Sequence, residues 1–358
     1  MLTRIPNTQT GSLTDNELGT NDYLVGTGVL YGDAYGMLDL SVGGLDTLTG
    51  SAGVTNNFFG DAYYISNSAR GNYDVLIGGN GAFNQFRGDA FLMSDYSRGG
   101  ADKLVGGRFR SLNIFYGDAD SMSDNSRGGN DTLIGGDGST NYLHGDAYSM
   151  SDSVVAGSDI LTGGVGATNT LVGDAALDMS GSARGGNDSL TGGGRSSNLL
   201  VGDAYTMSAY AVGGRDTLIG GGVGSTNALI GDSSYISDNA RCGNDRLVSG
   251  SASTDHMWGD AQFIDTVAAS PSAPLGTVRT GADTFVFGRN NGNDDINDFR
   301  QSDHDRIDVS AYGFHSLADL TITAVGGNTK IAFDANNSVT LVGVSDPSVL
   351  KASDFIFA

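Results

Sequence analysis

Apolar residues recur along the chain in columns whose members are 28 or 29 residues apart. One column stands three residues before the aspartate of each Gly-Asp pair, a second follows that aspartate by four residues, and a third is the leucine of a recurring Asp-x-Leu. No segment carries apolar residues at i, i+3 and i+4, the pattern of an amphipathic helix. Glycine-rich stretches such as GGDGST lie between the columns and supply turns. The pattern therefore predicts short strands joined by glycine corners.

A repeat of this length cannot bury its own apolar face, but stacked repeats form one continuous core. We therefore predict an all-β fold, a parallel β-solenoid (β-helix or β-roll) of about eight 28–29-residue rungs over residues 23–265. Three short strands per rung fit the spacing, and rungs about 4.8 Å apart would make a rod of roughly 40 Å. The rival geometry is a flattened, two-sided roll of nine-residue half-turns. In such a roll consecutive repeats would alternate faces, because a repeat holds about three half-turns.

The remaining segments divide the chain further. Residues 1–22 are predicted to be an N-terminal leader or cap. Residues 266–276, TVAASPSAPLG, have the composition of a linker, and residues 277–358 are predicted to form a small β-rich C-terminal domain. No run of 18 apolar residues occurs, so no transmembrane segment is predicted.

Two columns of aspartate accompany the apolar columns. The Gly-Asp column consists of Asp33, Asp61, Asp89, Asp118, Asp146, Asp174, Asp203, Asp232 and Asp260. The Asp-x-Leu column consists of Asp46, Asp74, Asp102, Asp131, Asp159, Asp188, Asp216 and Asp245. If the strand ran on through Gly-Asp, its aspartate would face away from the core, because the apolar residue before it and the alanine after it share one face.

Stacked aspartates require compensation. Carboxylates about 5 Å apart repel by roughly 3 kcal/mol at an effective dielectric of 20 and by nearly 1 kcal/mol in water. Arginine precedes the Asp-x-Leu acid by four residues in five repeats, so it can compensate only part of the charge. Ca²⁺, which binds carboxylates and backbone carbonyls, is the natural remaining partner. The Asp-x-Leu acids follow glycine turns and are the better metal candidates, whereas the Gly-Asp acids could instead cap their own turns.

Composition narrows the possible partners. The net charge of −22 argues against nucleic acid and anionic membranes and favours cations. The single cysteine, Cys242, replaces a glycine of the sister repeats and is interpreted as filling a slot for a small residue. No H-E-x-x-H, G-x-S-x-G or P-loop is present, so no enzyme is predicted. The alternative is a polysaccharide-binding or polysaccharide-modifying (lyase- or epimerase-like) β-helix. The aromatic column Tyr35, Tyr63, Phe91, Tyr148 and Tyr205 could serve sugar binding or self-association, or could simply stack.

The segment RGGNDTLIGGDGSTNYLHGD (127–146) resembles the hemolysin-type, or RTX, calcium-binding repeat G-G-x-G-x-D-x-U-x. Residues 281–320, with GADTFVF, NGNDDINDF and DRIDVSAYG, are similar to the C-terminal RTX domain of serralysin-like proteases. The turn here reads SRGGND, so about one intact site per repeat is implied. The resemblance also implies that four further acids are Ca²⁺ ligands or caps: Asp283, Asp294, Asp298 and Asp305.

The resemblance carries expectations about biology as well. The closing SDFIFA looks like a signal read by type I secretion machinery, which would explain the absence of a classical N-terminal signal peptide. We therefore expect a secreted, extracellular protein that folds on binding Ca²⁺ and serves as a structural, adhesive or matrix component. Self-association and cell-surface polysaccharide are the expected partners besides calcium.

Overall fold

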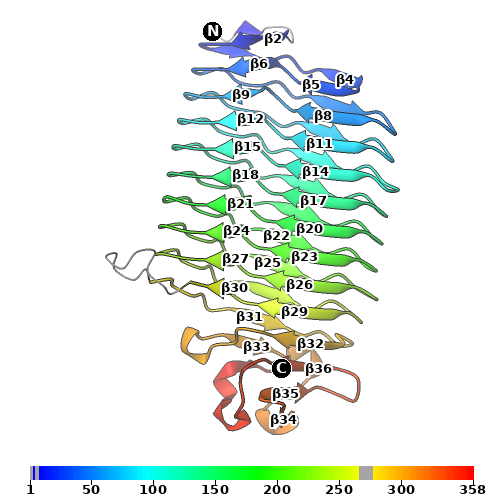
Figure 1. The fold of residues 1–358 in the computed structure, drawn as a ribbon, viewed down its shortest axis with the longest axis vertical. Coiled ribbons are helices and arrows are strands. Elements are labelled where there is room, and N and C mark those ends of the chain that lie inside the picture. The colour runs from blue at the N-terminus through cyan, green and yellow to red at the C-terminus, as the bar shows by residue number, and fades with distance from the viewer. Residues whose placement is uncertain (1–2, 5–7, 266–276) are drawn as a thin grey trace.

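The computed structural model describes residues 3–4, 8–265 and 277–358, and the chain winds into a parallel β-solenoid of about nine turns (Figure 1). Each full rung contributes one strand to each of three sheets, which we call sheets I, II and III. The prediction of an all-β solenoid with three-sided rungs is therefore confirmed. The predicted linker, 266–276, lies outside the described residues.

The strands of each sheet are stacked in chain order, except that β36, β35 and β34 follow β32 in reverse order at the end of sheet II. Sheet I contains β4 (Tyr23–Gly26), β7 (Thr47–Gly50), β10 (Val75–Ile77), β13 (Lys103–Val105), β16 (Thr132–Ile134), β19 (Ile160–Thr162), β22 (Ser189–Thr191), β25 (Thr217–Ile219), β28 (Arg246–Val248), β31 (Thr284–Val286), β33 (Arg306–Asp308) and β37 (Phe355–Ile356). Sheet II contains β5 (Gly28–Tyr31), β8 (Thr55–Phe59), β11 (Phe83–Arg87), β14 (Leu112–Tyr116), β17 (Thr140–His144), β20 (Thr168–Val172), β23 (Ser197–Val201), β26 (Thr226–Ile230), β29 (Thr254–Trp258), β32 (Asn293–Ile296), β36 (Ser338–Leu341), β35 (Asn328–Ala332) and β34 (Thr321–Val325). Sheet III contains β2 (Thr8–Leu13), β6 (Ala34–Met37), β9 (Tyr64–Ile65), β12 (Ala90–Met93), β15 (Ala119–Met122), β18 (Ala147–Met150), β21 (Ala175–Met179), β24 (Ala204–Met207), β27 (Ser233–Ile236) and β30 (Ala261–Ile264).

Successive rungs are in register, so each sequence column becomes a column in space. Leu76 pairs with Leu104 in sheet I, and Phe86 pairs with Phe115 in sheet II. The extra residue before Met179 is absorbed as a bulge in β21, after which Met150 and Met179 are again partners. The insertion therefore shifts no apolar column.

Two apolar cores fill the rod. The leucines of sheet I pack against the phenylalanines and leucines of sheet II. Behind sheet III, a separate core contains small and flexible side chains, mainly the alanines and the Met or Ile column. The chain crosses between these cores at its Gly-Asp corners and again ahead of each Asp-x-Leu, and both acid columns lie there.

The two ends of the solenoid differ. The segment 277–358, predicted as a separate domain, is joined to the rungs: β31 pairs with β28, and β32 pairs with β29. The antiparallel strands β34 and β35 follow β36 at the end of sheet II, below the last rungs in Figure 1. Sheet III stops at β30. The short 3₁₀ helices of this end are η1 (Gln301–Asp303), η2 (Ser310–Tyr312), η3 (Leu317–Asp319), η4 (Pro347–Val349) and η5 (Ala352–Asp354).

At the other end, part of the predicted leader or cap pairs with the first rung. Strand β2 adds to β6 in sheet III, and Leu18 forms a bridge to Val42. Strands β1 (Thr3–Arg4) and β3 (Glu17–Leu18) pair with each other. Across the described residues, no helix has the length and apolar character needed to cross a membrane.

Candidate metal centre

Both acid columns lie inside the rod. Every aspartate of the Gly-Asp and Asp-x-Leu columns is buried, with at most 2% of its surface exposed. The expectation that the Gly-Asp acids face away from the core is therefore wrong. Its premise was a strand that continues through Gly-Asp, whereas β11 ends at Arg87, β12 begins at Ala90, and Asp89 occupies the corner between them. A side chain at a corner does not follow the alternation of a strand.

The Asp-x-Leu column is held by the backbone of the neighbouring rung. The amide of Asp74 donates to Oδ1 of Asp102 at 2.7 Å, and the amide of Asp131 donates to Oδ1 of Asp159 at 2.6 Å. The same bond recurs from rung to rung. The second oxygen, Oδ2, is buried without a hydrogen-bond partner at all eight members of the column. Each carboxylate is thus fixed by one oxygen and free at the other.

The Gly-Asp column has the same half-satisfied character. An amide later in the chain donates to each of these carboxylates, for example from Gly129 to Oδ1 of Asp118 at 2.8 Å. The donor stands eleven or twelve residues after the aspartate, except at Asp260, where it is Gly281. One oxygen is buried without a partner in seven of the nine, within the described part of the chain. The exceptions are Asp89, whose two oxygens both accept from Gly100, and Asp260, which also pairs with Arg300.

Glycine allows the two columns to meet. A Cβ on Gly60 would collide with the carbonyl oxygen of Gly88 and with Oδ2 of Asp74. A Cβ on Gly71 would collide with Oδ1 of Asp89 and come within 2.7 Å of Oδ2 of Asp61. Oxygens from successive rungs therefore converge on positions where only a hydrogen atom fits.

Burial raises the pKa of these carboxyl groups, so they ionise less readily. Desolvation is the main cause that raises the pKa of Asp33, Asp89, Asp146 and Asp203 to about 6, and that of Asp46 to about 8. Repulsion between neighbouring members adds to burial in the rest of the ladder. The double column therefore needs bound protons or bound cations to persist inside the rod.

The four C-terminal candidates separate into different environments. Asp283 continues the Asp-x-Leu column, accepting from the amide of Asp245 at 2.8 Å, and Asp305 accepts in turn from Asp283 at 3.0 Å. Asp298 accepts from the amides of Gly259 and Asp260, one on each oxygen, and so acts as a cap. Asp294 belongs to sheet II, away from the double column, and accepts from Ser249 and Asn291.

The arginine column does not compensate the acids. Arg70, Arg98 and Arg127 are bridge partners of one another on the outside of the rod, where they are exposed. Among the described residues, none of them forms an ion pair with an aspartate of either column. The expected partial pairing is therefore absent, and the buried charge has no arginine counterpart along most of the rod.

A further buried polar column, formed by asparagine, was not predicted from the sequence. Its members are Asn56, Asn84, Asn113, Asn141, Asn169, Asn198 and Asn227, all on sheet II and all buried. Each side chain donates to the next, for example from Asn84 to Asn113 at 2.8 Å. The 28- or 29-residue recurrence of this asparagine is visible in the sequence, but we did not predict that its side chain points inward.

In the comparison with known proteins, no family model and no curated protein matches the chain. The assignment of a metal centre therefore depends on the buried oxygens themselves.

Proposed function

We propose that the protein is a secreted, non-enzymatic calcium-binding repeat protein that folds on Ca²⁺ outside the cell as a structural, adhesive or matrix component. The observation that carries this proposal is the buried double column of carboxylates, each fixed by one oxygen and mostly without a partner at the other. Two carboxylates per rung carry two negative charges, so one divalent cation per rung would neutralise them.

The donor set favours a hard cation. Carboxylate oxygens and nearby glycine carbonyls are the ligands that Ca²⁺ takes, in flexible geometry. Mg²⁺ usually retains several waters and requires near-ideal octahedral geometry, which suits this tightly packed interior less well. The backbone amides already orient one oxygen of each carboxylate, so the ligands are arranged before a cation arrives.

Cation binding would then supply folding free energy directly. Where Ca²⁺ is scarce, uncompensated buried charge opposes stacking of the rungs and keeps the chain extended for export. Where Ca²⁺ is abundant, binding to the folded state alone shifts the equilibrium toward the rod. Extracellular modules bind Ca²⁺ with dissociation constants of about 10⁻⁴ to 10⁻³ M, which matches this role.

The test is a Ca²⁺ titration of cation-depleted protein at pH 7.5, followed by far-UV circular dichroism, with Mg²⁺ as the control. We expect a cooperative coil-to-β transition at about 10⁻⁴ to 10⁻³ M Ca²⁺. Calorimetry of Asp118→Asn/Asp131→Asn should then show fewer bound ions. The matched variant Asp124→Asn/Asp137→Asn removes two exposed charges of the same repeat and should leave the ion count unchanged. A cation-free chain that is already folded, and is unmoved by Ca²⁺, would refute the proposal.

The exposed arginine column favours a second candidate function, the binding of an acidic polysaccharide. On a chain with net charge −22, arginines share one column of the rod, interrupted by Val155 and Val212, and none of them forms an ion pair with a described residue. A polyanion lying along the rod would neutralise them. The full set is Arg70, Arg98, Arg127, Arg184, Arg241 and Arg279.

The aromatic column supports sugar binding less well. Tyr35 stacks on Tyr63 at 5.2 Å with an angle of 4° between the rings, and Tyr63 stacks on Phe91 at 5.1 Å with an angle of 5°. These three rings therefore turn their faces toward one another rather than toward solvent. Sugars usually stack on an open ring face, so this column is better explained as stiffening the rod.

Co-sedimentation with a polyuronate and with a neutral glucan would test the second candidate. Arg98→Gln/Arg127→Gln should weaken polyuronate binding, whereas Arg215→Gln/Arg246→Gln removes two exposed arginines outside the column and should not. Equal losses in the two variants would indicate only a general charge effect.

A further inference from the structure

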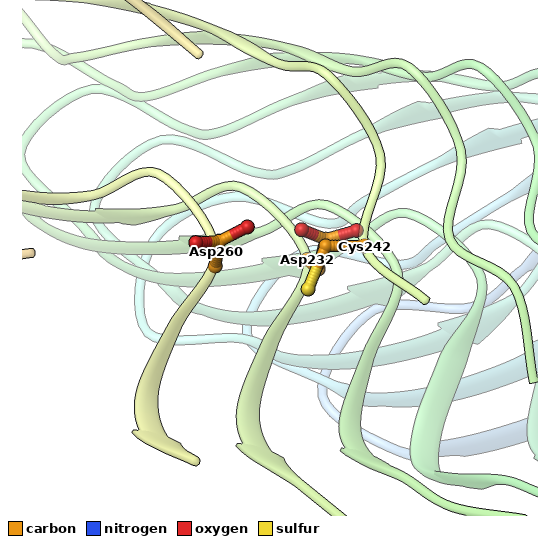
Figure 2. Close-up of side chains that lie close together, drawn as sticks. All are labelled: Asp232, Cys242 and Asp260. Atoms are coloured by element: carbon orange, nitrogen blue, oxygen red, sulfur yellow. The ribbon is translucent and has the colours of Figure 1, made fainter. Parts of the chain in front are cut away.

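Cys242 occupies a special position in the acid columns. The corresponding residue is glycine in six sister rungs and Ala156 in one. In the rung before Cys242, a Cβ on Gly213 would collide with carboxylate oxygens of both Asp203 and Asp232. A cysteine at this position therefore places its sulfur among the buried carboxylates, as Figure 2 shows.

The three side chains at this position can meet one cation. Asp232, Cys242 and Asp260 each offer one ligand atom, and these atoms all lie within 4.8 Å of one another. Oδ1 of Asp232 accepts from the amide of Gly243, whereas its Oδ2 has no hydrogen-bond partner although the residue is fully buried. A tetrahedral zinc with bonds of about 2.0 to 2.3 Å separates its ligands by roughly 3.3 to 3.8 Å, so only a small contraction is needed.

The charges around the three groups also fit a divalent metal. Asp260 accepts from Arg300 at 3.0 Å through Oδ2 and from the amide of Gly281 through Oδ1. Two carboxylates, one thiolate and one guanidinium leave a net charge of −2. A divalent metal would supply the missing positive charge.

We propose that Asp232, Cys242 and Asp260 form a mixed thiolate–carboxylate site for zinc or a similar borderline divalent metal. The sulfur ligand distinguishes this site from every other rung, whose donors are oxygens that suit Ca²⁺. The proposal goes beyond calcium-dependent folding and does not depend on it, since the three donors converge whether or not the remaining rungs take Ca²⁺.

The experiment uses Cd²⁺ as a spectroscopic probe on the full chain, folded in Ca²⁺. Because Cys242 is the only cysteine, thiolate-to-cadmium absorption in the ultraviolet reports this residue alone. We expect one equivalent of Cd²⁺ to produce the band in the presence of excess Ca²⁺, and Zn²⁺ to displace it. Zn²⁺ should also protect the thiol from alkylation.

Three variants decide the outcome. Cys242→Gly restores the residue of the sister rungs, so it should fold normally and lose the band. Asp232→Asn should weaken Cd²⁺ binding about tenfold or more, whereas Asp118→Asn, four rungs away in the same column, should not. Absence of the band, or an unchanged affinity in Asp232→Asn, would overturn the proposal. The Ca²⁺-driven folding transition of Cys242→Gly is scored separately, so failure of the zinc site and failure of calcium-dependent folding are distinguishable.

Discussion

Two kinds of buried polar column run along the same rod, one of asparagine and one of aspartate, and they satisfy their hydrogen bonds in opposite ways. In the asparagine column, Nδ2 of Asn84 donates to Asn113 at 2.8 Å and to the carbonyl of Gly79 at 3.0 Å. Its Oδ1 accepts from Asn56 at 2.8 Å and from the amide of Gly79 at 3.0 Å. Every polar atom of this neutral amide therefore has a partner.

The acid columns cannot be completed by the protein in this way. An amide both donates and accepts, so a stack of amides satisfies itself, but an ionised carboxylate only accepts. The backbone supplies about one donor per carboxylate, and the second oxygen remains without one at most positions. A buried column of acceptors therefore requires protons or cations from outside, whereas a buried column of amides requires nothing.

One residue of the asparagine column supports this interpretation. Asp255 follows Asn227 in the same register and is also buried. Its carboxylate accepts from Asn227, Ser249, Ser253 and the amide of Gly250, and both of its oxygens have partners. This buried carboxylate is thus surrounded by donors, and such donors are missing along the acid columns.

The largest expected difference between the columns is in the response to pH. The raised pKa values of Asp33, Asp89, Asp146 and Asp203, about 6 against an ordinary 3.8, mean that the folded cation-free chain holds protons that the unfolded chain releases. The stability contributed by these groups should therefore be fully present below about pH 4 and be lost as pH rises through about 6. Each such group costs about 3 kcal/mol, so four together rival the roughly 5–15 kcal/mol of a typical domain.

Circular dichroism at pH 4.5, 6 and 8, with and without 5 mM Ca²⁺, would measure this response. We expect cation-free protein to be folded at pH 4.5 and unfolded at pH 8, and Ca²⁺ to restore the fold at pH 8. Stability that is flat from pH 5 to 8 without cations would mean that the acid columns are satisfied by the protein alone.

Breaking the asparagine column should cost less and should be insensitive to both pH and Ca²⁺. Asn141→Leu removes the acceptor for Nδ2 of Asn113 and the partner of the amide and carbonyl of Gly136. Groups left unsatisfied in a buried site cost about 1–3 kcal/mol each, so a loss of roughly 3 kcal/mol or more is expected.

Urea unfolding in saturating Ca²⁺ at pH 6 and at pH 8 would give the value. The control is Tyr142→Thr. Tyr142 is exposed and pairs with Thr170 in the next rung, so the substitution introduces a residue that this column already contains. A loss that changes strongly with pH would show that the two polar columns are coupled rather than independent.

The repeat period made much of the fold predictable. The one-to-one pairing of Phe86 with Phe115, and the bulge that returns Met179 to its column, follow from spacing alone. Continuity into the C-terminal part was also visible, because Asp283 and Phe285 repeat the Asp-x-Leu pattern and Phe285 pairs with Leu247. We nevertheless predicted a separate domain, because this part of the sequence is similar to the C-terminal domain of other proteins.

The inward direction of the Gly-Asp acids could not be predicted in the same way. Strand alternation assigns a face only while a strand continues, and Asp89 stands where one strand ends and the next begins. For Asn84, alternation alone left two choices, since a polar residue in a strand is usually solvated. The decisive contact is with Asn113 in the next rung, 29 residues along the chain.

The smallest expected effect on stability comes from replacing one aspartate of the acid columns with asparagine, the residue of the other column. In Asp159→Asn, Oδ1 can still accept from the amide of Asp131, and Nδ2 takes the place of the unpartnered Oδ2. Oδ2 of Asp159 and the carbonyl oxygen of Gly173 lie close to the same point, because a Cβ placed on Gly145 would collide with both oxygens. A donor would then meet an acceptor, and the cation-free chain should gain about 1–2 kcal/mol near pH 6.

Asp159→Ala is the matched control, because it removes the same charge without adding a donor. If the amide provides the gain, Asp159→Asn will exceed Asp159→Ala in cation-free urea unfolding, and both variants will gain less from Ca²⁺ than the parent chain. Equal stabilisation by the two variants would assign the effect to relief of charge repulsion alone. If Asp159→Asn is less stable than the parent chain both with and without Ca²⁺, a lack of hydrogen-bond donors is not what distinguishes the acid columns from the asparagine column.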